Sequence, residues 1–129
     1  MKWTYKGEEF DEAPEDYLGF VYLITEKSTG KMYVGKKLFW NKAWKQVKGK
    51  RKRTLKESNW KTYYGSSKSL NESVEEHGEE NYEREILRLC KKKGELSYYE
   101  AKEQFDRDVL INDNYYNAFI GCKIHAKHL

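Results

Sequence analysis

One segment combines cationic and aromatic side chains in a pattern that suits contact with phosphate groups. Between Lys36 and Lys68 the chain has 12 lysines and arginines but one acid, Glu57, which gives the segment a net charge of +11. Aromatic faces beside cations are typical of nucleic-acid-binding surfaces, and six aromatic residues interleave with these cations: Phe39, Trp40, Trp44, Trp60, Tyr63 and Tyr64. The alternative is a solvated lysine-rich loop, because a block of like charge repels itself.

Residues 19–37 place two phenols near glycines and follow them with two cations. Two runs of β-formers, at 20–25 and 32–35, flank a polar stretch that contains Ser28, Thr29 and Gly30, so we expect a β-hairpin. The first arm has Tyr22, the second has Tyr33, and Lys36 and Lys37 follow at once. This arrangement would hold two phenols on one rim of a small sheet, with lysines to bring phosphate to them.

Helices and one more strand are expected to position these residues. Ser67 and Gly78 favour the two ends of a helix at 68–77, and residues 82–90 alternate as a strand does. Residues 95–110 contain no helix breaker, and their apolar stripe predicts the longest helix: Tyr98, Ala101, Phe105 and Val109. A short helix is predicted at 41–47. The sequence therefore predicts an α+β fold, with a small three-stranded antiparallel sheet and flanking helices.

The composition predicts one folded domain, over residues 1–129. The 129 residues fit a single core, and although mean hydropathy is low at −1.04, aromatic residues at 16% supply large apolar surfaces. Residues 1–17 form a polar lead-in, expected to pack through Trp3, Tyr5 or Phe10 if at all. Residues from 111 on form a tail.

The sequence gives no indication of export or membrane insertion. The first 17 residues lack a signal-peptide pattern, and no apolar run approaches the about 18 residues that a spanning helix needs. The two cysteines, Cys90 and Cys122, form no CxxC pair, so nothing favours an oxidising compartment. We expect no membrane partner and a cytoplasmic location, in a bacterial or phage-infected host cell.

The order of several short motifs resembles the GIY-YIG nuclease superfamily. The motifs are FVY at 20–22, YVG at 33–35, GSSKSLNESVEEHG at 65–78, a later helix with a glutamate, and YYN at 115–117. They cover a core of about residues 19–117. Small phage-type homing-endonuclease-like members are the most similar, through YVGKK and WKTYYGSS.

The resemblance implies a metal-dependent endonuclease that hydrolyses DNA phosphodiester bonds. It implies that Tyr22 assists attack by water and that Tyr33 holds the site or contacts the phosphate. A phenol with a pKa near 10 is a poor base at neutral pH, so we expect Lys36 or Lys37 to favour the phenolate. The alternative for both tyrosines is packing in the core.

The resemblance also implies one carboxylate ligand for a divalent cation, Mg²⁺ or Mn²⁺, and no small-molecule cofactor. A hard cation that keeps most of its waters needs few protein ligands. Glu100 is the preferred ligand because YEAKEQF is similar to the family pattern, and Glu103 is the alternative. Asn117 matches the family's closing asparagine, which is expected to order the site by hydrogen bonds.

The chain departs from the family pattern at the arginine that stabilises the transition state. In that interval the sequence has Lys42 and Lys45, and its arginines come later, at Arg51 and Arg53. We expect Arg53 to take the role, narrowly before Arg51. A lysine lacks the bidentate fork of an arginine, so a non-catalytic nucleic-acid-binding module on the same scaffold is the main alternative. A protein-interaction domain with an acidic partner is a weaker one.

Further residues are expected to bind DNA along the basic segment and before the first long helix: Lys37, Lys45, Lys50, Arg51, Lys52, Trp60, Lys61, Tyr64, Ser66 and Ser67. The oligomeric state stays open, with a homodimer as one option. Cys122, His125 and His128 lie at three-residue intervals but have no evident fourth ligand, so no zinc site is assigned there.

Overall fold

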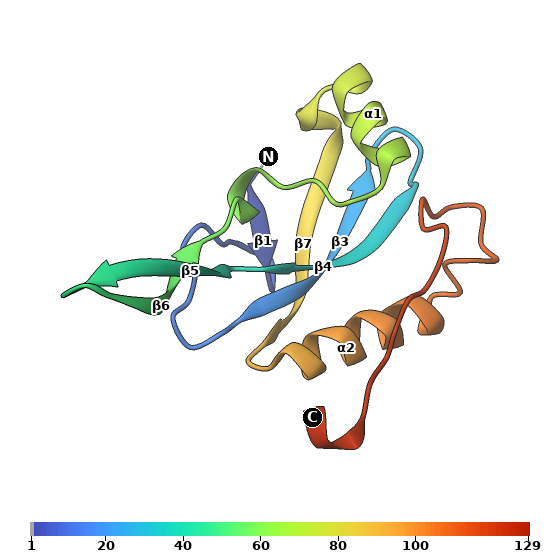
Figure 1. Cartoon of the computed structure of the whole chain (residues 1–129). Coiled ribbons are helices and arrows are strands. Elements are labelled where there is room, and N and C mark those ends of the chain that lie inside the picture. The colour runs from blue at the N-terminus through green and yellow to red at the C-terminus, as the bar shows by residue number, and fades with distance from the viewer. Residues whose placement is uncertain (1) are drawn as a thin grey trace.

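The computed structural model describes residues 2–129 and centres on the hairpin of strands β3 (Gly19–Glu26) and β4 (Met32–Leu38). The strands are antiparallel, and Tyr22 lies opposite Gly35. Gly30, in the connecting turn, has a positive φ of 77°, which glycine adopts without steric cost. The predicted hairpin is confirmed (Figure 1).

The main sheet has five strands, in the order β2-β1-β7-β3-β4. Strand β7 (Tyr82–Cys90) confirms the predicted third strand, whereas β1 (Trp3–Tyr5) and β2 (Glu8–Glu9) come from the expected lead-in. Strand β1 runs parallel to β7. The predicted three-stranded antiparallel sheet is therefore wrong in strand number and in one orientation, although the α+β class is confirmed.

Aromatic packing explains why the N-terminal segment joins the sheet. The Trp3 side chain is 1% exposed, its ring packs edge-on against Phe20 and Tyr22, and its indole N–H donates to the carbonyl of Trp60 at 2.7 Å. A buried tryptophan removes a large apolar area from water, so Trp3 stabilises β1 at the edge of β7.

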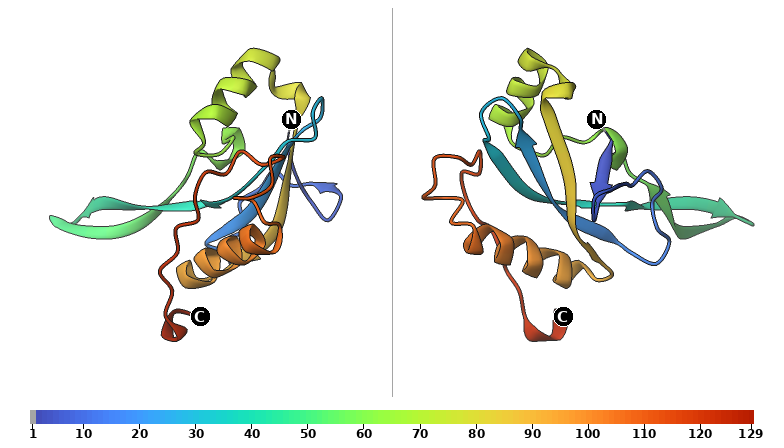
Figure 2. Two further views of the ribbon diagram at one scale, coloured as in Figure 1. Left: turned by 90° about the vertical axis from the view of Figure 1, so that its right-hand side faces the viewer. Right: turned by 180° about the vertical axis from the view of Figure 1, so that it is seen from behind.

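The two longer helices lie on opposite faces of the sheet (Figure 2). Helix α1 (Lys68–His77) has the predicted bounds; Ser67 accepts a hydrogen bond from the Leu70 amide, and Gly78 follows its last residue. The α1 face also holds the short 3₁₀ turns η1 (Trp60–Thr62) and η2 (Glu79–Asn81), which flank α1 in the chain. Leu70 and Val74 of α1 pack into the larger core cluster.

Helix α2 (Lys93–Asp106) covers the other face and differs from the prediction in extent and rotation. Leu96, Ala101 and Gln104 are its buried residues, whereas Tyr98 and Phe105 are 40% and 63% exposed. The predicted apolar stripe is therefore wrong at these two rings. The helix begins two residues earlier than predicted and ends four earlier.

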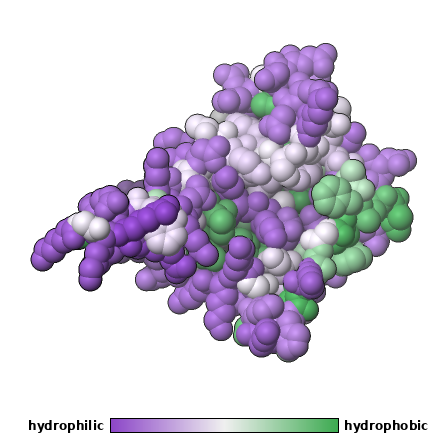
Figure 3. Space-filling model, in the orientation of Figure 1, coloured by the Kyte–Doolittle hydropathy of each residue, from purple (hydrophilic) through white to green (hydrophobic). Residues whose placement is uncertain are grey.

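The basic segment forms a separate two-stranded hairpin of β5 (Trp40–Val47) and β6 (Lys50–Glu57). Lys48 and Gly49 have φ values of 52° and 75°, and two positive φ values form the kind of two-residue turn that matches strand twist. The predicted helix at 41–47 is wrong, because this segment pairs with β6 along its whole length, from Trp40 with Glu57 to Val47 with Lys50. Figure 3 shows mainly hydrophilic side chains over this projecting hairpin.

The chain after α2 returns to the open edge of β4. The Met32 amide donates to the Asn114 carbonyl at 2.7 Å, the Tyr116 amide donates to the Met32 carbonyl at 2.8 Å, and Met32 and Tyr115 form a parallel bridge. The tail then runs past α2 to a last 3₁₀ turn, η3 (Ala126–His128). Within residues 2–129, no helix is long and apolar enough to cross a bilayer.

Candidate active site

The register of the β3–β4 hairpin fixes the position of the Tyr22 ring. A Cβ atom on Gly35 would lie 2.3 Å from the Tyr22 hydroxyl oxygen, and one on Gly65 would lie 3.3 Å from it. Glycine at these two positions therefore makes room for the phenol, which is 1% exposed. Gly65 also has a φ of +91°, which side chains other than glycine rarely adopt.

The surroundings of the Tyr22 phenol favour its protonated form. Burial raises its pKa well above the usual value, and interactions with Tyr63, Tyr33 and Glu100 act in the same direction. The expectation that Lys36 or Lys37 favours the phenolate is therefore wrong. The Lys36 ammonium contacts Ser97 Oγ at 2.9 Å, and the Lys37 ammonium lies 4.2 Å above the Tyr63 ring.

A pocket of about 630 Å³ lies along the edge of β4, and the buried Tyr22 is not among its lining residues. It collects side chains from β4, the start of α1, the middle of α2 and the tail. Six of the residues singled out by the sequence line it: Tyr33, Lys36, Ser66, Ser67, Glu100 and Asn117. Residues separated by up to 84 positions thus meet in one place, as the motif order predicts.

Glu100 is the acidic residue that reaches this pocket. Its side chain is 15% exposed and lies 3.8 Å from the Lys36 ammonium. Burial raises the pKa of its carboxyl group, while the Lys36 ammonium and a hydrogen bond from the Lys36 amide act in the opposite direction. Glu103 instead accepts a hydrogen bond from Arg107 Nε at 2.9 Å and does not line the pocket.

Asn117 attaches the tail to the open edge of β4. Its Oδ1 accepts from the Val34 amide at 3.1 Å, and its Nδ2 donates to the Val34 carbonyl at 2.8 Å. Gln104 Nε2 of α2 donates to the same carbonyl at 3.2 Å. Because these two amide atoms replace a neighbouring strand, Asn117 orders one wall of the pocket through the backbone.

The start of α1 forms the opposite wall. The Tyr33 and Ser66 hydroxyls are 3.0 Å apart and hydrogen-bonded, and Ser67 caps the helix. Burial raises the pKa of the Tyr33 phenol, although the hydrogen bond with Ser66 acts in the opposite direction. Lys68 also lines the pocket. This wall thus offers hydroxyls, a cation and the positive end of a helix dipole.

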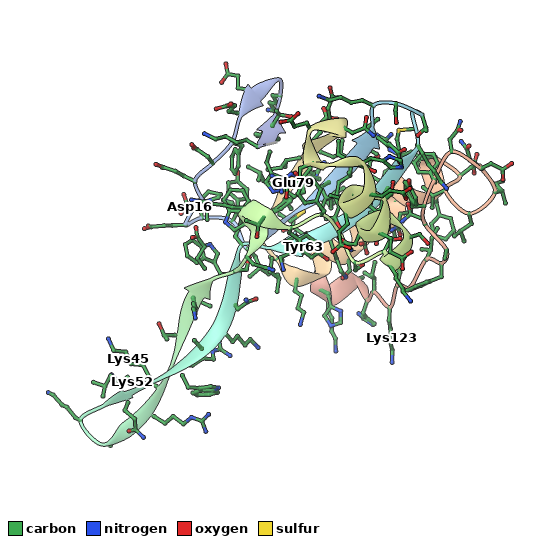
Figure 4. All side chains as sticks on the ribbon, turned by 90° about the horizontal axis from the view of Figure 1, so that it is seen from above. Asp16, Lys45, Lys52, Tyr63, Glu79 and Lys123 are labelled. Carbon is green, nitrogen blue, oxygen red and sulfur yellow. The ribbon has the colours of Figure 1, made fainter. Side chains whose placement is uncertain are left out.

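Several predicted residues lie elsewhere. Arg53, like Arg51, Lys45, Lys50 and Lys52, is exposed on the projecting hairpin (Figure 4), and none of these lines the pocket. The prediction that Arg53 serves the catalytic site is not supported by this placement, because β6 carries it away from the body. Lys61 is exposed near η1.

Two aromatic residues predicted to contact DNA belong to the core. Trp60 is fully buried and Tyr64 is 6% exposed, and both pack in the cluster beneath α1. The prediction of nucleic-acid contact is therefore wrong for these two rings in the folded chain. Their large apolar area is better buried than exposed.

Arg84, which the motif search missed, holds the loop before α1. It is 4% exposed, and its Nη1 donates to the carbonyls of Lys61 and Tyr63 at 3.0 and 2.9 Å. Its guanidinium also stacks on the Trp3 and Tyr64 rings. The alternation of β7 indicates the inward position of Arg84. Lys68, Gln104 and Tyr116 of the pocket were also missed, because only the tertiary fold brings them there.

The donor set of the pocket fits a hard divalent cation of the kind that keeps its own waters. Among residues 2–129, no group of three or more His, Cys, Asp and Glu side chains gathers, and Glu100 is the one carboxylate in the lining of this pocket. Its partial burial disfavours an isolated negative charge, and a cation would relieve that cost. The pocket also contains the hydroxyls of Tyr33, Ser66 and Ser67, and oxygen atoms are the ligands that Mg²⁺ and Mn²⁺ prefer.

The α+β fold is consistent with a nuclease domain of the GIY-YIG type. Residues 3–120 match the family model described as "Putative endonuclease segE, GIY-YIG domain", so the chain belongs to the GIY-YIG nuclease superfamily. No curated protein and no solved structure gives a significant match.

Proposed function

We propose that this chain is a divalent-cation-dependent endonuclease that hydrolyses phosphodiester bonds in DNA. The observation that carries the proposal is the meeting of Glu100 with Tyr33, Lys36 and Asn117 around one pocket. Membership of the GIY-YIG superfamily supports the nuclease class. We further propose that it acts in a cytoplasm, which is compatible with its two free cysteines, and that it resembles phage homing-type enzymes.

The cations and hydroxyls of the pocket would bind the scissile phosphate. Lys36 and Lys68 supply positive charge, and Ser66 and Ser67 supply hydroxyls at the start of α1, where helix N-termini attract anions. A transition state with extra charge on phosphate oxygens is stabilised by such fixed donors. In this proposal, the lysines stabilise the transition state, which is the role that the sequence predicted for Arg53.

In this proposal Tyr33 assists the attack of water through a hydrogen bond, and Tyr22 supports the site from below. Because burial raises the pKa of both phenols, neither is a preformed phenolate at neutral pH. Tyr33, which lines the pocket, would orient the attacking water. Tyr22 would fix the floor of the site through its hydrogen bond to Tyr63.

Glu100 would hold Mg²⁺ or Mn²⁺, with Asn117 ordering the edge of β4 beside it. When bound, the cation supplies Lewis-acid charge for the transition state. The carboxylate is suitably placed because Lys36 and the Lys36 amide fix it at the rim of the pocket. Glu103 is not needed, since its carboxylate is engaged by Arg107.

Cleavage of supercoiled plasmid by Lys36→Met and Tyr33→Phe variants tests the proposed roles. We expect Lys36→Met to lower the rate by about 100-fold, as loss of a transition-state donor does, and Tyr33→Phe to lower it by about 10-fold. Lys27→Met is the matched control, since Lys27 is exposed outside the pocket. Equal rates for all three variants and the unmodified protein would remove the assignment.

The second candidate is a nucleic-acid-binding module without catalysis. One observation favours it: no arginine of residues 2–129 lines the pocket, and lysine lacks the bidentate geometry of a guanidinium. The same plasmid assay separates the two functions. Binding of DNA without any metal-dependent nicking would favour the module.

A further inference from the structure

The β5–β6 hairpin is a free-standing arm of the molecule. Its strands pair with each other over eight positions, from Trp40 with Glu57 to Val47 with Lys50, and form a sheet of their own. At the usual rise per residue the arm is about 25 Å long. Figure 2 shows it extending from the sheet on the same side as α1, the side on which the start of α1 lines the pocket.

The arm carries a concentrated and uncompensated positive charge. Every residue of β6 is exposed, and the only acid between Trp40 and Glu57 is Glu57 itself, at the base. No ion pair within residues 2–129 involves the cations of the arm: Lys42, Lys45, Lys48, Lys50, Arg51, Lys52, Arg53 and Lys56. Such a surface is suited to a polyanionic partner.

The strand register divides this charge between two faces of different chemistry. Directly opposed residues share a face, and successive residues alternate. The arginine face includes the pairs Lys42 with Leu55, Trp44 with Arg53 and Gln46 with Arg51. The lysine face includes the pairs Asn41 with Lys56, Lys45 with Lys52 and Val47 with Lys50.

The arginine face is arranged for recognition rather than for charge alone. The Arg51 guanidinium lies 4.7 Å from the centre of the Trp44 ring, and Trp44 is 57% exposed. Stacking on an aromatic face restricts the guanidinium and leaves its edge free to donate. Arginine forms paired hydrogen bonds with guanine, and glutamine does so with adenine, whereas lysines bind phosphate as point charges.

We propose that the arm enters the major groove of duplex DNA, with its arginine face on the base edges and its lysine face supplying phosphate contacts. The inference deepens the proposed function, because it rests on DNA as the substrate. A two-stranded ribbon fits the major groove, which is about 12 Å wide, but not the minor groove of about 6 Å. The arm does not fit double-stranded RNA, because the major groove of an RNA duplex is too narrow.

Two double variants on the same strand test the inference with equal loss of charge. Arg51→Ala/Arg53→Ala removes the arginine face of β6, and Lys50→Ala/Lys52→Ala removes the lysine face. All four side chains are exposed, so circular dichroism should show an unchanged fold. Binding is measured with EDTA present, so that it does not depend on cleavage, on 30-base-pair duplexes selected from a random pool by the unmodified protein.

In the arginine variant, the ratio of the affinity for selected duplexes to the affinity for random duplexes should fall at least 10-fold. Methylation of guanine N7, which lies in the major groove, should no longer interfere with DNA binding by this variant. The lysine variant should keep the preference, bind all duplexes more weakly, and lower the slope of log affinity against log salt by about two. The unmodified protein should bind duplex DNA at least 10-fold more tightly than duplex RNA of the same sequence.

The inference is overturned if selection yields no preferred sequence, if both variants lose the preference equally, or if duplex RNA or single-stranded DNA binds as well as duplex DNA. Its failure is distinguishable from failure of the proposed function. Binding with an arginine-dependent preference but no cleavage would contradict only the nuclease assignment. Cleavage without that preference would contradict only the role of the arm.

Discussion

At the scale of single residues, the partly buried Glu100 lowers the stability of the folded protein, and a role in a functional site explains its presence. Burial raises the pKa of its carboxyl group. The stability that the protonated Glu100 contributes is therefore fully present below the pKa of an unfolded glutamate, and it is lost as the pH rises through the folded pKa. We therefore expect Glu100→Gln to raise the melting temperature at pH 7 by a few degrees. Below about pH 4 the two proteins should melt alike.

The matched control for this prediction is Glu103→Gln, one turn further along α2. Glu103 pairs with Arg107 at 2.9 Å with both side chains partly exposed, and such pairs contribute about 0.5 kcal/mol. Its replacement should leave the melting temperature unchanged or slightly lower. A lower melting temperature for Glu100→Gln at pH 7 would show that the carboxylate stabilises the fold.

Gly35→Ala should destabilise the protein through a single methyl group. That group would lie 2.3 Å from the Tyr22 hydroxyl oxygen, and overpacking of this kind costs about 1–3 kcal/mol. Urea unfolding measures the loss. Gly121→Ala is the control, because its nearest neighbour would be 3.7 Å away. Equal midpoints for the two variants would contradict the packing of Tyr22 over Gly35.

Residue types and spacing predicted part of the site. Tyr22 and Gly35 follow from hairpin register, and Asn117 follows from its motif. The choice between Glu100 and Glu103 depends on the rotation of α2, which the exposed Tyr98 and Phe105 obscured. Side chains that only the tertiary fold brings together, such as Lys68, have no local signal.

At the scale of elements, the tail acts as a partial strand on the edge of β4. Asn117→Ala removes the acceptor that the Val34 amide uses at 3.1 Å, whereas the Val34 carbonyl keeps Gln104. We expect hydrogen exchange of the Val34 amide to accelerate about 10-fold, the equivalent of one lost hydrogen bond, and plasmid cleavage to slow.

Asn41→Ala, on the exposed part of β5, is the control for this exchange measurement. It removes the same kind of side chain without removing a hydrogen bond to Val34, so the Val34 amide should exchange as in the unmodified protein. Unchanged Val34 exchange in Asn117→Ala would mean that the tail is held to β4 by other contacts.

Elements with strong local signals were predicted better than those that depend on their surroundings. Helix α1 follows from the cap at Ser67 and the glycine at 78. The β5–β6 hairpin was missed because its strands are rich in lysine and poor in β-branched residues, and its Lys48–Gly49 turn is an unusual form of the signal. Strand β1 was missed because burial of Trp3, not local propensity, places it in the sheet.

At the scale of the whole molecule, we expect the body and the arm to have separate tasks. Replacing residues 42–55 by Asn-Gly would join Asn41 to Lys56, which are opposed in the hairpin. Because the arm forms its own sheet, we expect a melting temperature within a few degrees of the unmodified protein. Affinity for duplex DNA at 0.1 M salt should fall about 100-fold, because seven cations are removed.

Circular dichroism measures the melting temperature of this variant, and fluorescence anisotropy measures its affinity for duplex DNA. A variant with lysine-to-glutamine changes at 91, 92 and 93, away from the arm, controls for a general loss of positive charge. Loss of the fold would show that the arm stabilises the body. Retained affinity would show that DNA binds elsewhere.

The central claim is that one pocket, with Glu100 at its rim, cleaves DNA. The most direct test is the rate of plasmid nicking in Mg²⁺ by Glu100→Gln beside Glu103→Gln, with EDTA controls. We expect the first variant to be slower by about 1,000-fold, from loss of the group that holds the cation, and the second to match the unmodified protein. Equal rates for the two variants, or nicking in EDTA, would contradict the claim.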